Sequence, residues 1–191
     1  MSFLPDEAVP RRRWNRKYDF TDETIERDGY VYHRIRAKKT FTLVTGEVVK
    51  KGDLGGFIEK EVNLSHDGNC WVKDNARAGG YMARIYDNAL LADQSAIGIG
   101  VELSGNAYVH GMSSLSLSVV TDNAEVKDSE LSQIYAGEEA KIISSVLRHN
   151  ARCKDGVFLE PNVLRIKGST VIEHNIVKKD CKSEKGFLDP K

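Results

Sequence analysis

The stretch NCWVKDNARAGGYMARIYDNALL, residues 69–91, repeats one short pattern. An Asp, Asn or Gly precedes a small residue, and an apolar residue follows two positions later, as in ARI at 83–85 and ALL at 89–91. Residues two apart share one face of a strand, whereas an amphipathic helix repeats every three or four residues. The stretch therefore predicts very short β-strands that send two apolar side chains inward and one variable residue outward.

The spacing of this unit predicts what the strands build. Successive copies of the unit lie six or seven residues apart, and longer steps of 18, 17 and 16 residues separate Ala89, Ala107, Ala124 and Ala140. Three sides of about six residues make one triangular coil, and coils stack at roughly the 4.8 Å strand spacing. We therefore expect an all-β fold, a single-stranded β-helix of about six coils over residues 64–177. A sandwich or barrel needs longer strands and sparser turns.

The sequence determines the handedness of the helix less strictly than it determines the β-helical architecture. Hexapeptide spacing favours a left-handed triangular helix, and the seven-residue steps leave a right-handed helix open. Outside the coils, residues 1–17 form a polar arm, residues 18–63 a small β-rich head that caps the helix, and residues 178–191 a charged tail. Within the head, TDETIER at 21–27 suggests a short helix and YVYHRIRA at 30–37 a strand.

Three glycines in GDLGGFI, residues 52–58, predict a close-packed junction between head and first coil. We expect Phe57 and Ile58 to fill the open end of that coil. At the other end, unpaired strand edges have to be covered. A fold-back of the tail or a second subunit would do so, which makes a homodimer or homotrimer an expectation.

Composition excludes several classes of protein. The chain has 28 basic and 28 acidic residues, so no overall field attracts nucleic acid or a membrane. No apolar run approaches the roughly 20 residues that span a bilayer, and the N-terminus has no signal-peptide pattern. Cys70, Cys153 and Cys181 are distant and odd in number, and no CxxC occurs, so neither disulfides nor a zinc site is expected. A soluble, cytoplasmic protein without a metal follows.

The run YHRIRAKKTF at 32–41 and the run VKKGDLGGFIEKEVNLSHDGNCWVKDNA at 49–76 resemble the YdcK-like β-helical proteins of bacteria and their phages. In that family a short β head leads through a glycine-rich passage into a CW-containing first coil and a left-handed β-helix. Phe57 stands where the family usually has Trp. The resemblance covers roughly residues 17–180, implies the architecture and the cytoplasm of a bacterial cell, and carries over no catalytic residue. Coils after Gly111 depart from the family's Asn-Ala iteration, which predicts loops or a specialised surface there.

Three functions remain open. The first is a non-enzymatic binding or scaffold protein that needs no cofactor, one form of which is a phage-encoded inhibitor docking on a host protein. Rigid flat faces suit binding because little ordering entropy is lost on docking. The outward residues that would contact a protein partner are Arg77, Arg84, Tyr86 and Tyr108. The simpler interpretation is that they are only the variable position of each unit.

The second function is a trimeric acyltransferase of the hexapeptide type. Such enzymes share this prism and use a coil histidine as general base at a cleft between subunits, a role open to His110. The competing interpretation of His110 is a solvated coil histidine, and the sequence shows no long loop that would cover a cofactor.

The third function is nucleic-acid binding through the arm, whose cations would neutralise phosphates and whose tryptophan would stack on a base. The residues concerned are Arg11, Arg12, Arg13, Trp14, Arg16 and Lys17. A solvated tail or an oligomer contact is the alternative for this cluster.

Overall fold

The structure is a computed structural model that describes residues 16–148 and, by backbone alone, four later strands: β20 (Val157–Glu160), β21 (Val163–Ile166), β22 (Val171–Glu173) and β23 (Ile176–Lys179). Most of the predicted arm and all but two residues of the predicted tail lie outside the described residues, as do Arg11, Arg12, Arg13 and Trp14. The boundaries of the arm and the tail therefore stay predictions.

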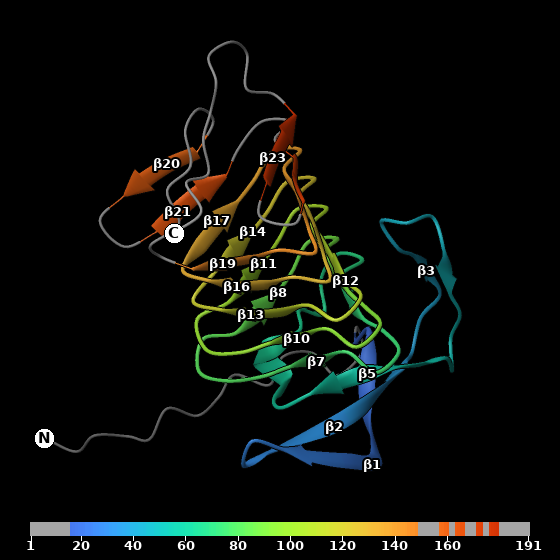
Figure 1. Cartoon of the computed structure of the whole chain (residues 1–191). Helices are drawn as coiled ribbons and strands as arrows, with labels where there is room; N and C mark the ends of the chain where they lie inside the picture. Colours follow the sequence, from blue (N-terminus) through green and yellow to red (C-terminus); the bar gives the residue numbers. More distant parts are fainter. Residues whose placement is uncertain (1–15, 149–156, 161–162, 167–170, 174–175, 180–191) are drawn as a thin grey trace, which may run out of the picture.

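Three sheets form the three faces of a prism (Figure 1). Face 1 contains β6 (Trp71–Val72), β9 (Leu90–Leu91), β12 (Tyr108–His110), β15 (Glu125–Lys127), β18 (Lys141–Ile143), β22 and β23. Face 2 contains β1 (Tyr18–Arg27), β2 (Tyr30–Ala37), β5 (Leu54–Ile58), β7 (Arg77–Ala78), β10 (Ala96–Ile97), β13 (Ser114–Ser116), β16 (Glu130–Ser132) and β19 (Val146–Arg148). Face 3 contains β8 (Arg84–Ile85), β11 (Glu102–Leu103), β14 (Val119–Val120), β17 (Ile134–Ala136), β21 and β20.

The chain visits the faces in turn, and each coil strand pairs in parallel with the strand one coil later. On face 1 the pairs are Trp71↔Leu90, Leu90↔Tyr108, Tyr108↔Glu125 and Glu125↔Lys141, so successive coils take 19, 18, 17 and 16 residues. About five turns can be followed. The predicted all-β solenoid is thus confirmed, while the left hand and the total of about six coils stay predictions.

Small buried residues at the corners let the chain bend sharply. Between faces 3 and 1 the stacked residues are Ala89, Ala107, Ala124 and Ala140, all fully buried as their spacing predicted. Between faces 1 and 2 the buried residues from the second coil onward are instead serines: Ser95, Ser113, Ser129 and Ser145. The hydroxyl of Ser129, for example, accepts a hydrogen bond from the Ser145 backbone at 3.1 Å, so the buried polar groups are satisfied.

The turns depend on residues in the left-handed backbone region. In the DN and DQ pairs at the turns it is the aspartate that takes a positive φ, 56° at Asp87 and 60° at Asp93. The same carboxylates accept hydrogen bonds from the backbone of the next coil, from Gly105 to Asp87 at 3.0 Å and from Gly111 to Asp93 at 2.8 Å. Aspartate tolerates this conformation and ties one coil to the next.

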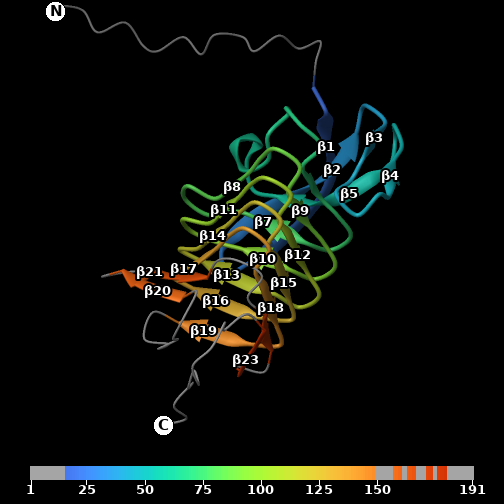
Figure 2. The same cartoon turned by 90° about the horizontal axis from the view of Figure 1, so that it is seen from above.

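The head lies at one end of the prism, opposite β22 and β23 (Figures 1 and 2). It contains β1, β2 and β5, the β3 (Phe41–Thr42) and β4 (Val48–Val49) hairpin, and the 3₁₀ helix η2 (Glu61–Asn63). The helix predicted at 21–27 is wrong, because these residues belong to β1, which pairs antiparallel with β2. Asp28 and Gly29, with φ of 54° and 78°, form a tight turn that makes this pairing possible.

The glycine-rich junction is close-packed, as predicted. A Cβ on Gly55 would lie 2.6 Å from the Trp71 ring, and one on Gly56 would lie 2.6 Å from the carbonyl oxygen of Ala76. Ile58 is fully buried in the core. Phe57 does not fill the coil end as expected: it shares an outward register with Arg77, and the Arg34 guanidinium lies 5.0 Å from its ring centre.

The coils after Gly111 continue without a break. Between residues 112 and 148, where loops or a specialised surface were predicted, β13 to β19 follow at short intervals with no long loop between them. The predicted loops are therefore wrong for this part of the chain, where serines replace alanines at several corners. A specialised surface there stays a prediction. Among the described residues, no helix is long and apolar enough to cross a membrane.

Candidate functional site

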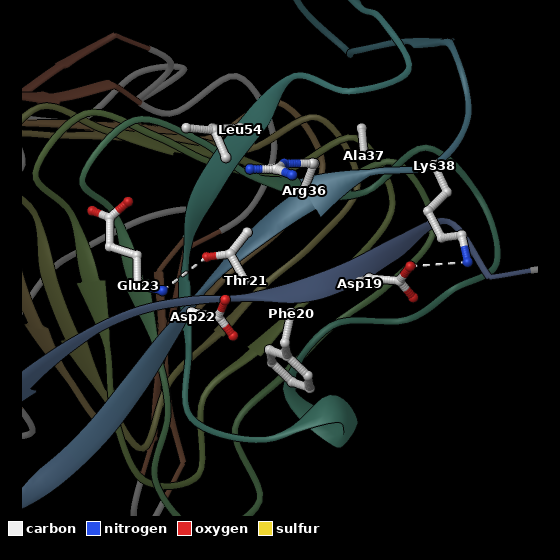
Figure 3. Close-up of a pocket in the computed structure, with 9 residues that line it drawn as sticks. All are labelled: Asp19, Phe20, Thr21, Asp22, Glu23, Arg36, Ala37, Lys38 and Leu54. Carbon is white, nitrogen blue, oxygen red and sulfur yellow. Dashed lines mark hydrogen bonds and ion pairs between the residues drawn. The ribbon is translucent and has the colours of Figure 1, made fainter.

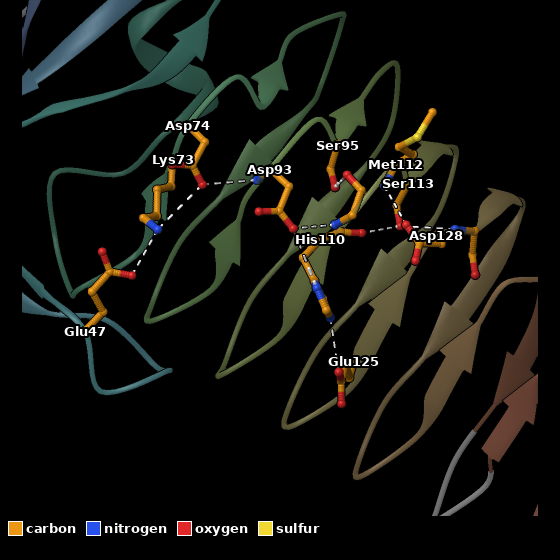
Figure 4. Close-up of polar contacts among 12 residues, drawn as sticks. Glu47, Lys73, Asp74, Asp93, Ser95, His110, Met112, Ser113, Glu125 and Asp128 are labelled. Carbon is orange, nitrogen blue, oxygen red and sulfur yellow. Dashed lines mark hydrogen bonds and ion pairs between the residues drawn. The ribbon is translucent and has the colours of Figure 1, made fainter.

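His110 ends β12 on face 1, next to the corner that leads to face 2 (Figure 4). Because Val109 points inward, the side chains of Tyr108 and His110 both point outward. Their rings stack with centroids 4.1 Å apart and planes 3° apart. Only 13% of the His110 side chain is exposed, so it is not the solvated histidine of the simpler interpretation.

The Glu125 carboxylate contacts one nitrogen of the His110 ring at hydrogen-bond distance. Its Oε1 lies 3.1 Å from His110 Nε2, and its Oε2 accepts a hydrogen bond from Lys141 Nζ at 2.8 Å. Tyr108, Glu125 and Lys141 are register partners, so three successive coils supply this cluster. Burial opposes the charge of Glu125, but the hydrogen bonds from Lys141 and His110 outweigh it and lower the carboxyl pKa. Glu125 is therefore an ionised acceptor.

An ionised acceptor at Nε2 fixes the proton of a neutral His110 on that nitrogen. The other nitrogen, Nδ1, then carries the lone pair. Asp93 Oδ2 lies 3.8 Å from Nδ1, too far for a hydrogen bond, and already accepts the Gly111 backbone N–H. Nδ1 can accept a proton from a bound molecule, which is the requirement for a general base.

Charged side chains continue along the same edge toward the head (Figure 4). Lys73 Nζ lies 3.0 Å from a carboxylate oxygen of Glu47, next to β4, and 3.6 Å from one of Asp74. The backbone N–H of Asp93 donates to Asp74 at 3.4 Å. In the described part of the chain, no three His, Cys, Asp or Glu residues gather as metal ligands.

The four outward residues predicted to contact a protein partner do not form one surface. Arg77 lies on face 2, Arg84 and Tyr86 belong to face 3, and Tyr108 lies on face 1 beside His110. The Tyr86 hydroxyl donates a hydrogen bond to the Glu102 carboxylate. These residues therefore cannot contact one partner through a common flat face, and a binding role for each of them stays a prediction.

Two residues of the basic cluster are described, and neither extends as an arm. Arg16 forms an ion pair with Glu61 at 3.2 Å. Lys17 is only 2% exposed, and its ammonium donates to the carbonyl of Gly68 at 3.3 Å and to Cys70 Sγ at 3.0 Å. Lys17 joins the head to the first coil, so its assignment to a nucleic-acid contact is wrong.

A shallow hollow in the head lies beside the irregularity of β1 (Figure 3). Asp19 and Lys38 form an ion pair there at 2.9 Å, and the Thr21 hydroxyl accepts the backbone N–H of Glu23 at 3.2 Å. Leu54 and Arg36 line the opposite side. The polar groups of the hollow named here thus contact one another.

The comparisons with known proteins agree with the fold. The chain is 30% identical over 124 residues to a protein of Escherichia coli (strain K12) named uncharacterized acetyltransferase YdcK, a match that covers 62% of this chain. The matched part is 32% of the relative, so the chain spans about a third of its length. No known protein-family profile matches the chain. The similarity and the solenoid together fit a β-helix of the hexapeptide-repeat type.

Sequence reasoning found His110 but missed Glu125 and Lys141. Each follows a corner alanine, as Tyr108 follows Ala107, so the steps of 17 and 16 residues place all three in one column. Aligning the outward positions by those steps would have found them.

Proposed function

We propose that this protein transfers an acyl group from a thioester donor to a hydroxyl or amine, with His110 as general base. The observation that carries the proposal is the His110–Glu125 pair, in which one ring nitrogen contacts Glu125 at 3.1 Å and the other lies 3.8 Å from Asp93, beyond hydrogen-bond distance. The β-solenoid fold and the name of the Escherichia coli relative support the same activity.

The chemistry follows from the two ring nitrogens. Nδ1 takes the proton of the acceptor as its oxygen or nitrogen attacks the thioester carbonyl carbon. The resulting tetrahedral intermediate collapses, the C–S bond breaks, and the imidazolium returns the proton to the departing thiolate. Glu125 stabilises the imidazolium and keeps the ring oriented, so it is a positioning residue rather than a catalytic one.

The test measures thiol release from acetyl-CoA in the presence of a panel of amines and alcohols. Substitution His110→Asn is expected to lower the rate by about 10²- to 10⁴-fold, the usual contribution of general base catalysis. His33→Asn in β2 is the matched control and should leave the rate unchanged. Thiol release that is equal in wild type and His110→Asn, or absent in wild type, contradicts the proposal.

A second function, binding of another protein molecule, is favoured by an apolar row on the corner between faces 2 and 3. Four side chains there are between about half and three quarters exposed: Tyr81 at 76%, Met82 at 61%, Ile99 at 49% and Leu117 at 51%. Backbone hydrogen bonds from Gly100 to Tyr81 and from Leu117 to Ile99 stack them over three coils. Exposed apolar rows of this kind are typical of interaction sites.

Light scattering tests this second function. We expect a mass above that of one chain, either from a second copy or from a co-purified partner, and its loss in the Tyr81→Ser/Leu117→Ser double variant. A double variant of Val48 and Val62, both exposed in the head, serves as the control. A monomeric wild-type protein that retains no partner on purification contradicts it.

A further inference from the structure

A groove crosses the outer surface of face 2, between strand β1 and the first coils, with a volume of about 590 Å³. Its floor follows from the register. Phe57, Arg77, Ala96 and Ser114 are successive outward partners on β5, β7, β10 and β13. The two large side chains, Phe57 and Arg77, are followed by the two small ones, Ala96 and Ser114. The outer surface of face 2 is therefore lower at β10 and β13 than at β5 and β7. The volume is within the range of small-molecule sites.

Positive charge gathers at the head end of this groove. Arg27, Arg34 and Arg77 line it, together with the single carboxylate of Glu23. Glu23 accepts a hydrogen bond from Arg34 Nη1 at 3.2 Å. Within residues 16–148, no carboxylate lies at ion-pair distance from Arg27 or Arg77. Three guanidinium groups and one carboxylate leave two positive charges without a counter-charge in the groove.

Arg34 is held in place before any ligand arrives. Its guanidinium lies 5.0 Å from the ring centre of Phe57, and 19% of its side chain is exposed. Stacking on an aromatic ring and one carboxylate contact reduce the freedom that the side chain would lose on binding. Among the described residues, its Nε is the buried side-chain donor that lacks a hydrogen-bond partner.

We propose that this groove binds an organic phosphate monoester. Two surplus positive charges match the charge of a phosphate group above pH 7, and the guanidinium fork matches its oxygens. A single carboxylate carries half that charge. Ile25, Phe57 and Met112 supply apolar contacts for the organic part of the ligand. The site is independent of acyl transfer, because the groove lies on face 2 and the His110 ring on face 1.

Calorimetric titration of the full chain with phenyl phosphate at pH 7.5 and low salt tests this site. Phenyl phosphate should bind more tightly than either benzoate or inorganic phosphate, since only phenyl phosphate offers both the double charge and an apolar group. Arg77→Gln and Arg27→Gln should each weaken binding about tenfold or more. Arg84→Gln, an exposed arginine on face 3, is the matched control and should not change the affinity.

Other outcomes are equally informative. His110→Asn should bind phenyl phosphate as wild type does, which separates this site from the proposed acyl transfer. Unchanged affinity in both Arg77→Gln and Arg27→Gln would overturn the proposal. Tighter binding of an aspartate-rich peptide than of phenyl phosphate would also overturn it, and would assign the groove to a protein partner.

Discussion

At the scale of single residues, Lys17 shows how the head is fixed to the first coil. Its ammonium has three donors and three neighbouring acceptors: the carbonyls of Asp67 and Gly68 and the sulfur of Cys70. Burial lowers the Lys17 pKa, although the attraction of Cys70 and Asp67 opposes this effect. A buried amine is tolerated because its hydrogen bonds are made.

Lys17→Met tests this role. The variant keeps the apolar stem but removes the donor from all three acceptors, of which the Cys70 sulfur is buried, so we expect the free energy of unfolding in urea to fall by about 1–3 kcal/mol. Lys38→Met, which loses an exposed ion pair with Asp19, should cost less than about 1 kcal/mol. Equal losses in the two variants contradict a structural role for Lys17.

Glu125 predicts a pH dependence of stability. Its folded-state pKa is lowered from the ordinary value of 4.5, so its stabilising effect is present above that value and disappears as the pH falls through the folded pKa. At pH 7, Glu125→Gln should lower the free energy of unfolding by less than about 1 kcal/mol, because the site is partly solvated. The difference from wild type should shrink as the pH falls below 4.5. A difference that grows on acidification has the wrong sign for this explanation.

At the scale of elements, the coils depend on close contacts that only certain residues permit. Gly56 lies where a Cβ would contact the Ala76 carbonyl at 2.6 Å and the Val72 side chain at 2.7 Å. Gly98, on the corner between faces 2 and 3, has only the Leu115 carbonyl near, at 3.6 Å. Neither glycine has a positive φ, so the difference between them is one of space.

Gly56→Ala should therefore destabilise the protein by about 1–3 kcal/mol, the usual cost of overpacking. Gly98→Ala should change stability by less than about 1 kcal/mol. Thermal unfolding followed by circular dichroism measures both. Should Gly56→Ala unfold at the same temperature as Gly98→Ala, the junction is looser than the contacts at Gly56 indicate.

The same contacts explain which elements could be predicted from sequence. Alanine, aspartate and glycine at fixed steps predict the coils directly. Each corner requires a small residue, and each turn requires a residue that tolerates a positive φ. The strand at 21–27 was mistaken for a helix because its partner, β2, determines it and TDETIER contains no strand alternation. The buried serines were missed because their hydrogen bonds to neighbouring coils cannot be seen in composition.

At the scale of the whole molecule, stacking brings together residues that are distant in sequence. His110 could be singled out from sequence as a residue type, but Glu125 and Lys141 join it only through the register of three coils. The groove proposed to bind a phosphate monoester likewise brings residues of the head strand β1 together with outward residues of β7, β10 and β13, which no local sequence pattern predicts. Both sites are therefore products of the capped solenoid as a unit.

We propose that the coils assemble His110 and Glu125 into one pair that acts as a unit. A double-mutant cycle on the rate of thiol release from acetyl-CoA, with His110→Asn, Glu125→Gln and both changes together, tests it most directly. Because Glu125 acts through His110, the double variant should be about as slow as His110→Asn alone. Losses that multiply in the double variant would contradict the claim.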